Sequence, residues 1–400
     1  MKKIIILGAG VVGVTSAYFL AEKGYQVTVL EAKSSAGQGT SRANGAQLSY
    51  SKTFPLSNPK TLKKLPFYLF SKDSPMHIHA GFDLAFYKWG LQFLAESTNK
   101  KAHNNNDKVV KLALKSKAAL QHVLERSKIE FDFNQRGKMY IYTSEESYAA
   151  AAAYVDGQNA YGFDWRFMDI DEAVAKEPSL AHIKDKLVGV SYCPIDESGD
   201  AYKFTLELAK TCEKMGVKFV YDAPVTDFKR EKGRVKSVLA GGQEYEADDF
   251  ICCLGVYSPI VMKKLGISVP IYPMKGYSIT VPATVKAPKI NITDEGKRIV
   301  YSTIGGRLRV AGIAEFGGYN YEIDRKIMDR LIDDAATTMP DAGDFSKVEE
   351  WTGLRPMTPS TVPIIKKAGK YENLYLNTGQ GMLGWTLACG SAQELAELVG

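Results

Sequence analysis

Cysteine and histidine are both scarce in this 400-residue sequence, with five of each, and neither forms a pattern typical of a metal or redox site. The cysteines lie in apolar surroundings without a Cys-x-x-Cys spacing, at Cys193, Cys212, Cys252, Cys253 and Cys389. The histidines lack metal-ligand spacing with a third ligand, at His77, His79, His103, His122 and His182. We therefore expect buried reduced thiols, no metal, and solvated loop positions for His77 and His79.

Long apolar runs and a strong charge are also missing. No uncharged stretch of 18 or more apolar residues occurs, so the sequence predicts no membrane-spanning helix. Met1-Lys2-Lys3 precedes an apolar run, but glycines interrupt that run and no small-residue cleavage site follows, which argues against a signal peptide. The net charge of +6 would suit an anionic substrate or membrane surface and falls short of a nucleic-acid-binding surface. We expect a cytoplasmic protein with no nucleic-acid partner.

The periodicity of apolar residues predicts an α/β protein with two domains. Strand, helix and strand patterns at Lys3–Leu7, Val11–Lys23 and Gln26–Leu30 form a βαβ unit. Alternating patterns at Phe131–Tyr142 and Ile271–Val281 indicate a half-exposed antiparallel sheet. Further helices are expected at Leu112–Ile129, Tyr202–Met215 and from Trp385 towards Gly400, with a strand at Val217–Tyr221, a helix start at Ala149–Ala153 and a loop at Asn104–Asn106.

A glycine-rich turn follows the first strand. Gly8-Ala9-Gly10-Val11-Val12-Gly13 matches G-x-G-x-x-G, with the glycines allowing a tight turn, close approach of a pyrophosphate, and close helix packing. The amides and the dipole of the helix that begins here favour phosphate. Glu31, at the end of the second strand, is placed to accept hydrogen bonds from the adenosine ribose and would repel a 2′-phosphate. This motif predicts FAD or NAD rather than NADP, and its spacing does not separate the first two.

Other segments resemble the FAD-dependent D-amino-acid oxidase superfamily, and in particular its bacterial D-amino-acid dehydrogenases. Thr40-Ser41-Arg42-Ala43-Asn44-Gly45-Ala46-Gln47 is similar to the loop that lines the flavin, and Ala223–Thr226 and Cys253–Gly255 resemble two further cofactor segments. Asn377–Thr386 resembles the closing flavin loop, and Trp351–Pro359 resembles the segment before it. The resemblance implies FAD contacts by Val11, Val12, Thr40, Ser41, Asn44, Gly45, Gln47, Val225, Gly255, Gly379, Gly381, Met382, Leu383, Gly384, Trp385 and Thr386.

The resemblance also implies the way in which FAD is held and the layout of the domains. Gln380 stands where many members have a histidine, and neither Gln380 nor Met382 can bond covalently to a flavin, so we expect noncovalent FAD. We expect a Rossmann-like FAD-binding domain made of residues 1–128, 196–268 and 352–400. A second, mixed antiparallel-sheet (α+β) substrate domain is expected from residues 129–195 and 269–351.

On the substrate side, Arg355 resembles the arginine that binds a carboxylate in related amine oxidases, as a guanidinium fork is suited to do. The alternative is a salt bridge between domains. Tyr277, in Lys275-Gly276-Tyr277, is the second candidate, because an aromatic hydroxyl there would cover the ligand; the alternative is ordinary strand packing. Tyr257 is a weaker candidate, as is Arg309, which is expected on a sheet surface.

The activity implied is oxidative deamination of a D-amino acid by hydride transfer to flavin N5, giving a 2-oxo acid and ammonia, with electrons passed to a quinone or other carrier. The alternatives are an oxygen-using amine oxidase of the glycine, sarcosine or proline type, an NAD-dependent dehydrogenase, and a flavin-bound protein without turnover. Lys60–Phe70 joins three lysines to an aromatic cluster and suggests peripheral contact with the inner face of an anionic cytoplasmic membrane. Packing under a loop is the alternative for those aromatic residues.

Overall fold

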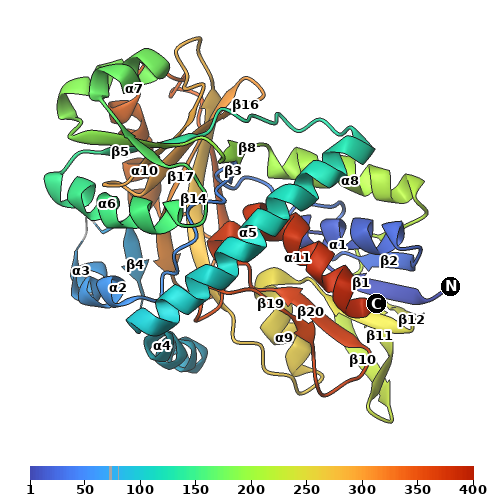
Figure 1. The fold of residues 1–400 in the computed structure, drawn as a ribbon. Helices are drawn as coiled ribbons and strands as arrows, with labels where there is room; N and C mark the ends of the chain where they lie inside the picture. Colours follow the sequence, from blue (N-terminus) through green and yellow to red (C-terminus); the bar gives the residue numbers. More distant parts are fainter. Residues whose placement is uncertain (72–73, 80) are drawn as a thin grey trace.

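The computed structural model describes residues 1–71, 74–79 and 81–400, and it contains two large sheets with helices around them (Figure 1). The first sheet has six strands in the order β19-β20-β13-β1-β2-β9. All neighbouring pairs in it are parallel except β19 with β20. The strands are β1 Lys3–Leu7, β2 Gln26–Leu30, β9 Lys218–Val220, β13 Asp249–Cys252, β19 Ile364–Lys367 and β20 Leu374–Thr378.

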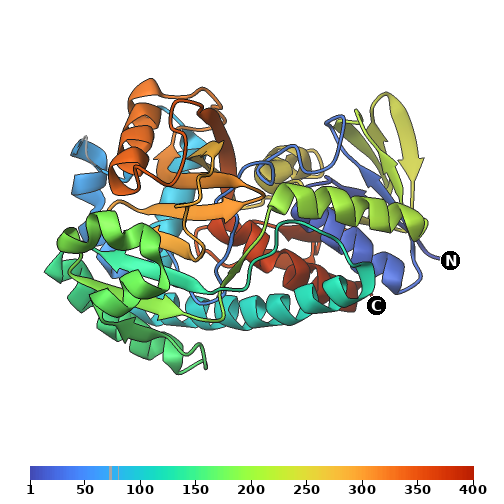
Figure 2. The same ribbon diagram turned by 90° about the horizontal axis from the view of Figure 1, so that it is seen from above.

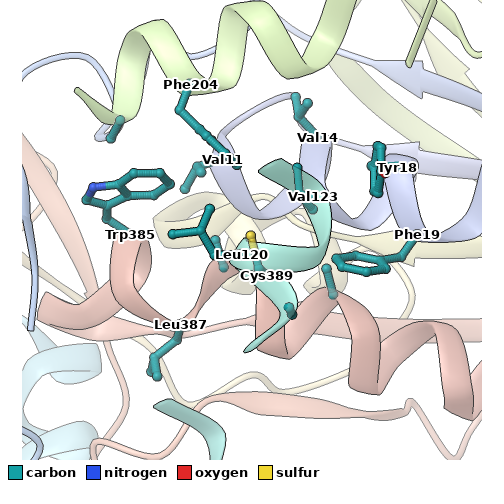
Figure 3. Packing of buried hydrophobic residues seen from close by; sticks show 14 of the residues in the cluster. Val11, Val14, Tyr18, Phe19, Leu120, Val123, Phe204, Trp385, Leu387 and Cys389 are labelled. Atoms are coloured by element: carbon teal, nitrogen blue, oxygen red, sulfur yellow. The ribbon is translucent and has the colours of Figure 1, made fainter. Parts of the chain in front are cut away.

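The predicted βαβ unit at the N-terminus is confirmed, with helix α1 (Val11–Glu22) between β1 and β2. Strand β1 is apolar and almost entirely buried because it is central in the sheet, and α1 packs beside α8 (Ala201–Lys214) and α11 (Gly384–Val399). Figure 3 shows side chains of α1 and α11 meeting those of α5 (Asn99–Ser127) in one apolar cluster. This cluster fixes the direction in which α1 leaves the glycine turn.

The second sheet has nine strands, of which eight follow the order β18-β14-β17-β16-β15-β5-β7-β6, while β4 pairs with β17. Its strands are β4 Met76–Ile78, β5 Lys138–Tyr142, β6 Arg166–Met168, β7 Gly189–Cys193, β14 Tyr272–Pro282, β15 Asn291–Asp294, β16 Ile299–Ile304, β17 Arg307–Phe316 and β18 Glu349–Met357. Helix α10 (Arg325–Thr338) covers one face. The two sheets lie side by side, with the long helix α5 running along both (Figures 1 and 2).

The remaining elements are short or peripheral. They include a three-stranded sheet of β10 Val225–Glu231, β11 Arg234–Ala240 and β12 Gln243–Glu246, and a pair formed by β3 Gln47–Leu48 and β8 Glu197–Ser198. The other helices are α2 Pro59–Lys63, α3 Leu65–Phe70, α4 Leu84–Glu96, α6 Glu145–Asn159, α7 Ile170–Lys176 and α9 Ser258–Lys263, with 3-10 turns η1 Pro178–Lys186, η2 Gly255–Tyr257 and η3 Gly381–Leu383.

Three expectations about local structure were wrong. Asn104–Asn106 belong to helix α5 rather than a loop, because the side chains of Asn105 and Asn106 bond to Glu96 and Thr53 instead of competing for the helix backbone. The strand expected at Phe131–Tyr142 begins only at Lys138. Before it, Asp132 and Gly137 adopt positive φ angles of 57° and 76°, which interrupt an extended chain.

The third wrong expectation is that the strand at Ile271–Val281 would be half-exposed. This strand is β14, and ten of its eleven residues are buried. One face packs beneath α10, and polar residues of the other face contact a loop of the first sheet's domain. The division into two domains stays a prediction, and β4 is a strand from the predicted FAD-binding part that pairs with the second sheet.

The five cysteines are free and buried, as expected. Burial raises the pKa of Cys193 to about 12, so this thiol stays protonated at neutral pH. Across residues 1–71, 74–79 and 81–400, no helix has both the length and the apolar character needed to cross a bilayer. In the same ranges, no three His, Cys, Asp or Glu side chains are grouped so that they could hold a metal ion.

The crossing of α5 and α11 depends on a missing side chain. A Cβ atom built on Gly390 would lie 2.7 Å from the backbone nitrogen of Ser116 and 2.8 Å from the carbonyl oxygen of Leu112. We predict that Gly390→Ala lowers the free energy of unfolding by about 1 to 3 kcal/mol, since the helices must move apart. Thermal unfolding measures this loss.

Gly157→Ala is the matched control, because Gly157 lies in α6 with open space where its Cβ would be. This substitution is expected to leave stability unchanged or raise it by up to about 1 kcal/mol. Equal unfolding temperatures for the Gly390→Ala variant and the wild type would contradict the packing argument.

Candidate active site

The carboxyl-terminal edge of the six-stranded sheet brings together four of the segments predicted to bind FAD. Gly8 follows β1, Glu31 follows β2, Gly255 follows β13 and Gly379 follows β20. Because these four strands are parallel neighbours, the turns after them all lie at one edge. Segments far apart in the sequence therefore form one site.

The turn between β1 and α1 requires its glycines. Gly8 has a φ of +99°, which disfavours any other residue, and a Cβ atom on Gly13 would lie 1.9 Å from the carbonyl oxygen of Gly8. Gly10 begins the helix without a side chain, so the first amides of α1 can be approached closely. The hydroxyl of Ser41 reaches this end and accepts a hydrogen bond from the Val11 amide at 3.1 Å. These features fit a pyrophosphate at the helix N-terminus.

The carboxylate of Glu31 is held in place beside that turn. Its oxygens accept hydrogen bonds from the amides of Ala9 at 2.6 Å and Lys33 at 2.9 Å. A carboxylate has about four acceptor positions, so two remain for the hydroxyls of a ribose. The backbone of Ala223 donates to the Glu31 carbonyl at 2.8 Å, which brings the start of β10 at Val225 next to the same position.

The closing loop leads from β20 through η3 into α11. Gly379 and Gly381 have φ angles of +81° and +57°, so the sharp turns there depend on glycine. Helix α11 begins at Gly384 after Leu383, whose side chain has no hydrogen-bonding group, and its first amides therefore point out of an uncapped end.

Two side chains of this loop point away from the helix start. Met382 is exposed, and Trp385 is buried against Phe204, with its indole nitrogen donating to the carbonyl of Gly199 at 3.1 Å (Figure 3). Because protein groups surround the Trp385 side chain, a contact of this residue with FAD would come from its backbone.

Residues 40–51, which we call the crossing loop, run across one face of the nine-stranded sheet. Six strands of that sheet each bond to the loop, and the strands and the loop residues follow the same order. In sheet order from β18 to β5, the bonds are Thr40 Oγ1 to Leu354 O at 2.7 Å, Ser278 Oγ to Ala43 O at 2.7 Å, Arg309 Nη1 to Asn44 O at 3.0 Å, Ser302 Oγ to Gly45 O at 3.1 Å, Gln47 Nε2 to Ile292 O at 3.2 Å and Lys138 Nζ to Ser49 Oγ at 2.9 Å.

Arg309 is a buried member of this set, so its expected place on a sheet surface was wrong. Its Nε donates to Thr280 Oγ1 at 2.6 Å, while Nη1 donates to the crossing loop. Burial lowers the pKa of Arg309 to about 10, which leaves it positively charged at neutral pH. Arg309 lies on β17 between Leu308 and Val310, whose side chains pack on the opposite, apolar face. This alternation was the available signal for its direction.

Arg355 lies on the same face of the sheet, near the end of β18. Its guanidinium rests directly on Gly276, where a Cβ atom would come within 2.2 Å of Arg355 Nη2. Within the part of the chain that the structure describes, it forms no hydrogen bond and no ion pair. Arg355 as a whole is partly exposed, but protein atoms crowd its guanidinium, and this desolvation lowers the pKa of Arg355 to about 10. A shielded, positively charged group without a partner is suited to bind an anion.

Tyr277 is not brought together with Arg355. In a strand, adjacent side chains point to opposite faces, and Tyr277 lies in the apolar cluster beneath α10 rather than beside Gly276. Its hydroxyl donates to Glu315, which also pairs with Lys275 at 3.0 Å. Tyr257 is half-exposed, and its hydroxyl lies 3.1 Å from that of Tyr321.

The histidines expected in loops differ from each other. His77 lies in strand β4 and is partly buried, so its prediction as a solvated loop residue was wrong. His79 follows that strand, and its Nε2 lies 3.5 Å from a carboxylate oxygen of Glu315.

Comparisons with known proteins agree with this geometry. The family model described as FAD dependent oxidoreductase matches residues 3–398. The chain belongs to this family of FAD-dependent oxidoreductases. It is 39% identical over 404 residues to the D-amino acid dehydrogenase of Dechloromonas aromatica, covering 99% of this chain and 96% of that protein. It is also 38% identical over 398 residues to the D-amino acid dehydrogenase of Agrobacterium fabrum, covering 99% and 95%.

Solved structures show the same fold. Glycine oxidase from Geobacillus kaustophilus superposes with a TM-score of 0.79 at 20% identity, covering 100% of this chain and 95% of that one. L-proline dehydrogenase from P. horikoshii gives 0.76 at 17% identity, covering 100% and 93%. The family and the fold predicted from the sequence are confirmed. The chain is thus an FAD-dependent enzyme whose closing loop contains no cysteine or histidine for a covalent bond to the flavin.

The first test of the site concerns Glu31. Glu31→Arg replaces a carboxylate that accepts hydrogen bonds with a cation that accepts none, so we predict weaker retention of FAD by about 1.5 to 3 kcal/mol. FAD occupancy after gel filtration and the Kd for FAD measure this. Glu213→Arg makes the same charge change on the exposed face of α8 and should retain FAD. Equal occupancy in the two variants would remove Glu31 from the site.

Proposed function

We propose that the protein catalyses the oxidative deamination of D-amino acids to 2-oxo acids and ammonia, with Arg355 binding the substrate carboxylate. The observation that carries this proposal is the shielded guanidinium of Arg355, which has no protein partner in the described residues. The D-amino acid dehydrogenases of Dechloromonas aromatica and Agrobacterium fabrum, similar over nearly their full length, support the substrate class.

Bound FAD would supply the two-electron acceptor for the hydride that leaves the substrate Cα. The protein must then bind and orient the amino acid, keep its amine neutral, and exclude water until the imine has formed. Water adds to the imine afterwards and releases ammonia and the 2-oxo acid. In this scheme no side chain acts as a nucleophile, so Arg355 contributes position rather than covalent chemistry.

The two glycines beside Arg355 make room for it. Gly276 lies under the guanidinium, and Gly353 lies under the ring of Trp351, where a Cβ atom would come within 2.0 Å of that ring. Strands β14 and β18 pair these glycines with each other. The arrangement supports a pocket in which a guanidinium binds the carboxylate next to an aromatic wall.

The electron acceptor that we propose is a membrane quinone or another carrier, met at the inner face of the cytoplasmic membrane. Helices α2, α3 and α4 lie at the end of the molecule opposite both termini (Figure 1). Residues 60–101 contain seven lysines and three acidic residues, which gives this segment a net charge of +4. The whole chain has a net charge of +6, so this segment is more positively charged than the rest of the sequence. Such a segment favours an anionic surface.

Helix α4 adds an apolar outer face to this end. Trp89 and Phe93 face inwards, as expected for a helix on a core, but Leu84 and Leu91 on the outside are 86% and 70% exposed. On α3, Phe67 is also exposed. Trp89 donates to the carbonyl of Met357, two residues from Arg355, so α4 is attached to the strand end that carries the proposed carboxylate site. Exposed apolar groups among lysines support contact with lipid.

The activity is tested by anaerobic reduction of the flavin, followed by reoxidation with air or with a quinone. D-amino acids are expected to bleach the flavin absorbance, while L-amino acids, sarcosine and glycine are not. Arg355→Leu should leave the spectrum of bound FAD intact but weaken substrate binding by about 2 to 5 kcal/mol, because a charge-assisted pair is lost. The substrate concentration at half-maximal reduction measures this.

Two further variants sharpen the test. Arg355→Lys keeps the charge but loses the bidentate fork, so its loss should be smaller. Arg230→Leu removes an exposed arginine from β10 and should match the wild type. Normal affinity in Arg355→Leu would exclude the proposed carboxylate site, and bleaching by glycine or sarcosine instead of D-amino acids would replace the proposed substrate class.

Membrane contact is tested with vesicles. The wild type should sediment with anionic vesicles at low salt, and the triple variant Lys60→Glu, Lys63→Glu, Lys64→Glu should not, since each lysine near such a surface contributes on the order of 1 kcal/mol. A triple glutamate variant at Lys214, Lys218 and Lys236, which are exposed and distant from α2, is the control and should sediment normally. Equal sedimentation of all three proteins, or none by the wild type, ends this hypothesis.

A further inference from the structure

Lys138 is a buried lysine that the proposed reaction does not use. Only 3% of its surface is exposed, and its Nζ donates one hydrogen bond, to Ser49 Oγ at 2.9 Å. The same Nζ lies 4.6 Å from the centre of the Tyr140 ring. Among residues 1–71, 74–79 and 81–400, it forms no ion pair. Burying an ammonium with one hydrogen bond costs free energy, so its retention here calls for a function.

The single hydrogen bond of Lys138 leads toward the site of the flavin. Ser49 belongs to the crossing loop, and its backbone nitrogen donates to Thr386 Oγ1 at 3.0 Å. Thr386 is the third residue of α11, whose uncapped N-terminus follows the glycines of the closing loop. A helix N-terminus carries a partial positive charge. Hydrogen bonds of Ser49 therefore connect the ammonium of Lys138 to the Thr386 hydroxyl in the first turn of α11.

Charged and titratable groups of both signs act on Lys138. Asp196 is the largest influence of opposite sign on Lys138, and its oxygens also accept hydrogen bonds from the Ser51 amide at 3.0 Å, the Ser51 hydroxyl at 2.7 Å and the Tyr140 hydroxyl at 3.2 Å. The other charged or titratable groups that act on Lys138 are Lys52, which pairs with Glu295 at 2.6 Å, and Cys193.

Burial shifts the pKa of Lys138 and of two of these neighbours. Burial lowers the pKa of Lys138 to about 8, although Asp196 opposes that shift. Burial raises the pKa of Asp196 and raises that of Cys193 to about 12. Lys138 therefore changes charge above neutral pH, while the cysteine stays protonated.

We propose that Lys138 is a positioning residue for the flavin, whose ammonium, held against Ser49 and the start of α11, makes the ring easier to reduce. Reduction places negative charge on the ring, and a fixed cation in a water-poor site stabilises that charge because no solvent has to reorganise. The proposal rests on FAD as the cofactor and not on the choice of D-amino acids as substrates. A failure of the proposed substrate class would therefore leave this proposal unaffected, and the reverse also holds.

The test compares Lys138→Met, which removes the charge at nearly constant volume, with Lys138→Arg, which keeps it. Two quantities are measured. The first is the reduction potential of the bound flavin, determined by equilibration with a redox dye in the absence of substrate, and the second is the affinity of the bound flavin for sulfite. Sulfite adds to N5 of oxidised flavin and leaves negative charge on the ring, so it reports the same electrostatics. We expect a lower potential and about tenfold or greater loss of sulfite affinity in Lys138→Met, with both values largely restored in Lys138→Arg.

A purely structural role would give a different result. Lys138→Met would then lose FAD or stability, while the flavin that remained bound would keep the wild-type potential and sulfite affinity, and this outcome overturns the proposal. Should Lys138→Met fail to fold, the wild type and Lys138→Arg decide. The sulfite affinity of the wild type must decline as the pH rises from 7 to 9.5 by more than that of Lys138→Arg, whose charge does not titrate there. Identical pH profiles for the two proteins also overturn the proposal.

Discussion

The crossing loop is the feature on which the rest of the site depends. Six neighbouring strands of the second sheet each form at least one hydrogen bond with residues 40–49, in the order in which the strands lie. Each bond alone stabilises by about 1 kcal/mol, but a shift of the loop by one residue would break all of them together. The loop thus has one register on the sheet, and that register sets the distance between the glycine turn and Arg355.

This attachment also explains why polar side chains are tolerated on a buried sheet face. Ser278, Ser302 and Arg309 are buried, and each donates to a loop carbonyl that would otherwise lack a partner. The opposite face is apolar beneath α10, so the sheet has one apolar face that packs against a helix and one polar face that carries the crossing loop. Tyr277 lies on the apolar face, and Arg355 lies on the polar face.

The parts of the site that were predictable from sequence are those that depend on local geometry. Gly8, Gly10 and Gly13 were assigned correctly to a turn before a helix because their conformations are dictated within six residues. The strand order places Glu31 beside that turn, as the spacing of a βαβ unit requires. The direction of Tyr277 was also within reach, because the period of two in a strand separates it from Gly276.

What was not predictable is the set of contacts between strands and the crossing loop. Whether Ser302 or Lys138 reaches the loop depends on which strands are neighbours in the sheet, and the neighbour of β5, strand β15, begins 149 positions after the end of β5. Arg309 looked like a surface residue because its covering loop comes from residues far away in the sequence. Arg355 became a candidate only through resemblance, since a lone arginine in a strand has no local signature.

Dissolved salt screens the exposed positive groups of the molecule more strongly than the groups that protein atoms surround. Lysines on α2 and α4 are exposed to salt, so any attraction that they exert on an anionic surface falls as ionic strength rises. Arg355 and Lys138 are shielded by protein atoms, and their effects on a carboxylate or a flavin should persist at the same salt concentration. Raised ionic strength would therefore weaken the proposed docking on an anionic surface and leave the electrostatics around Arg355 and Lys138 nearly unchanged.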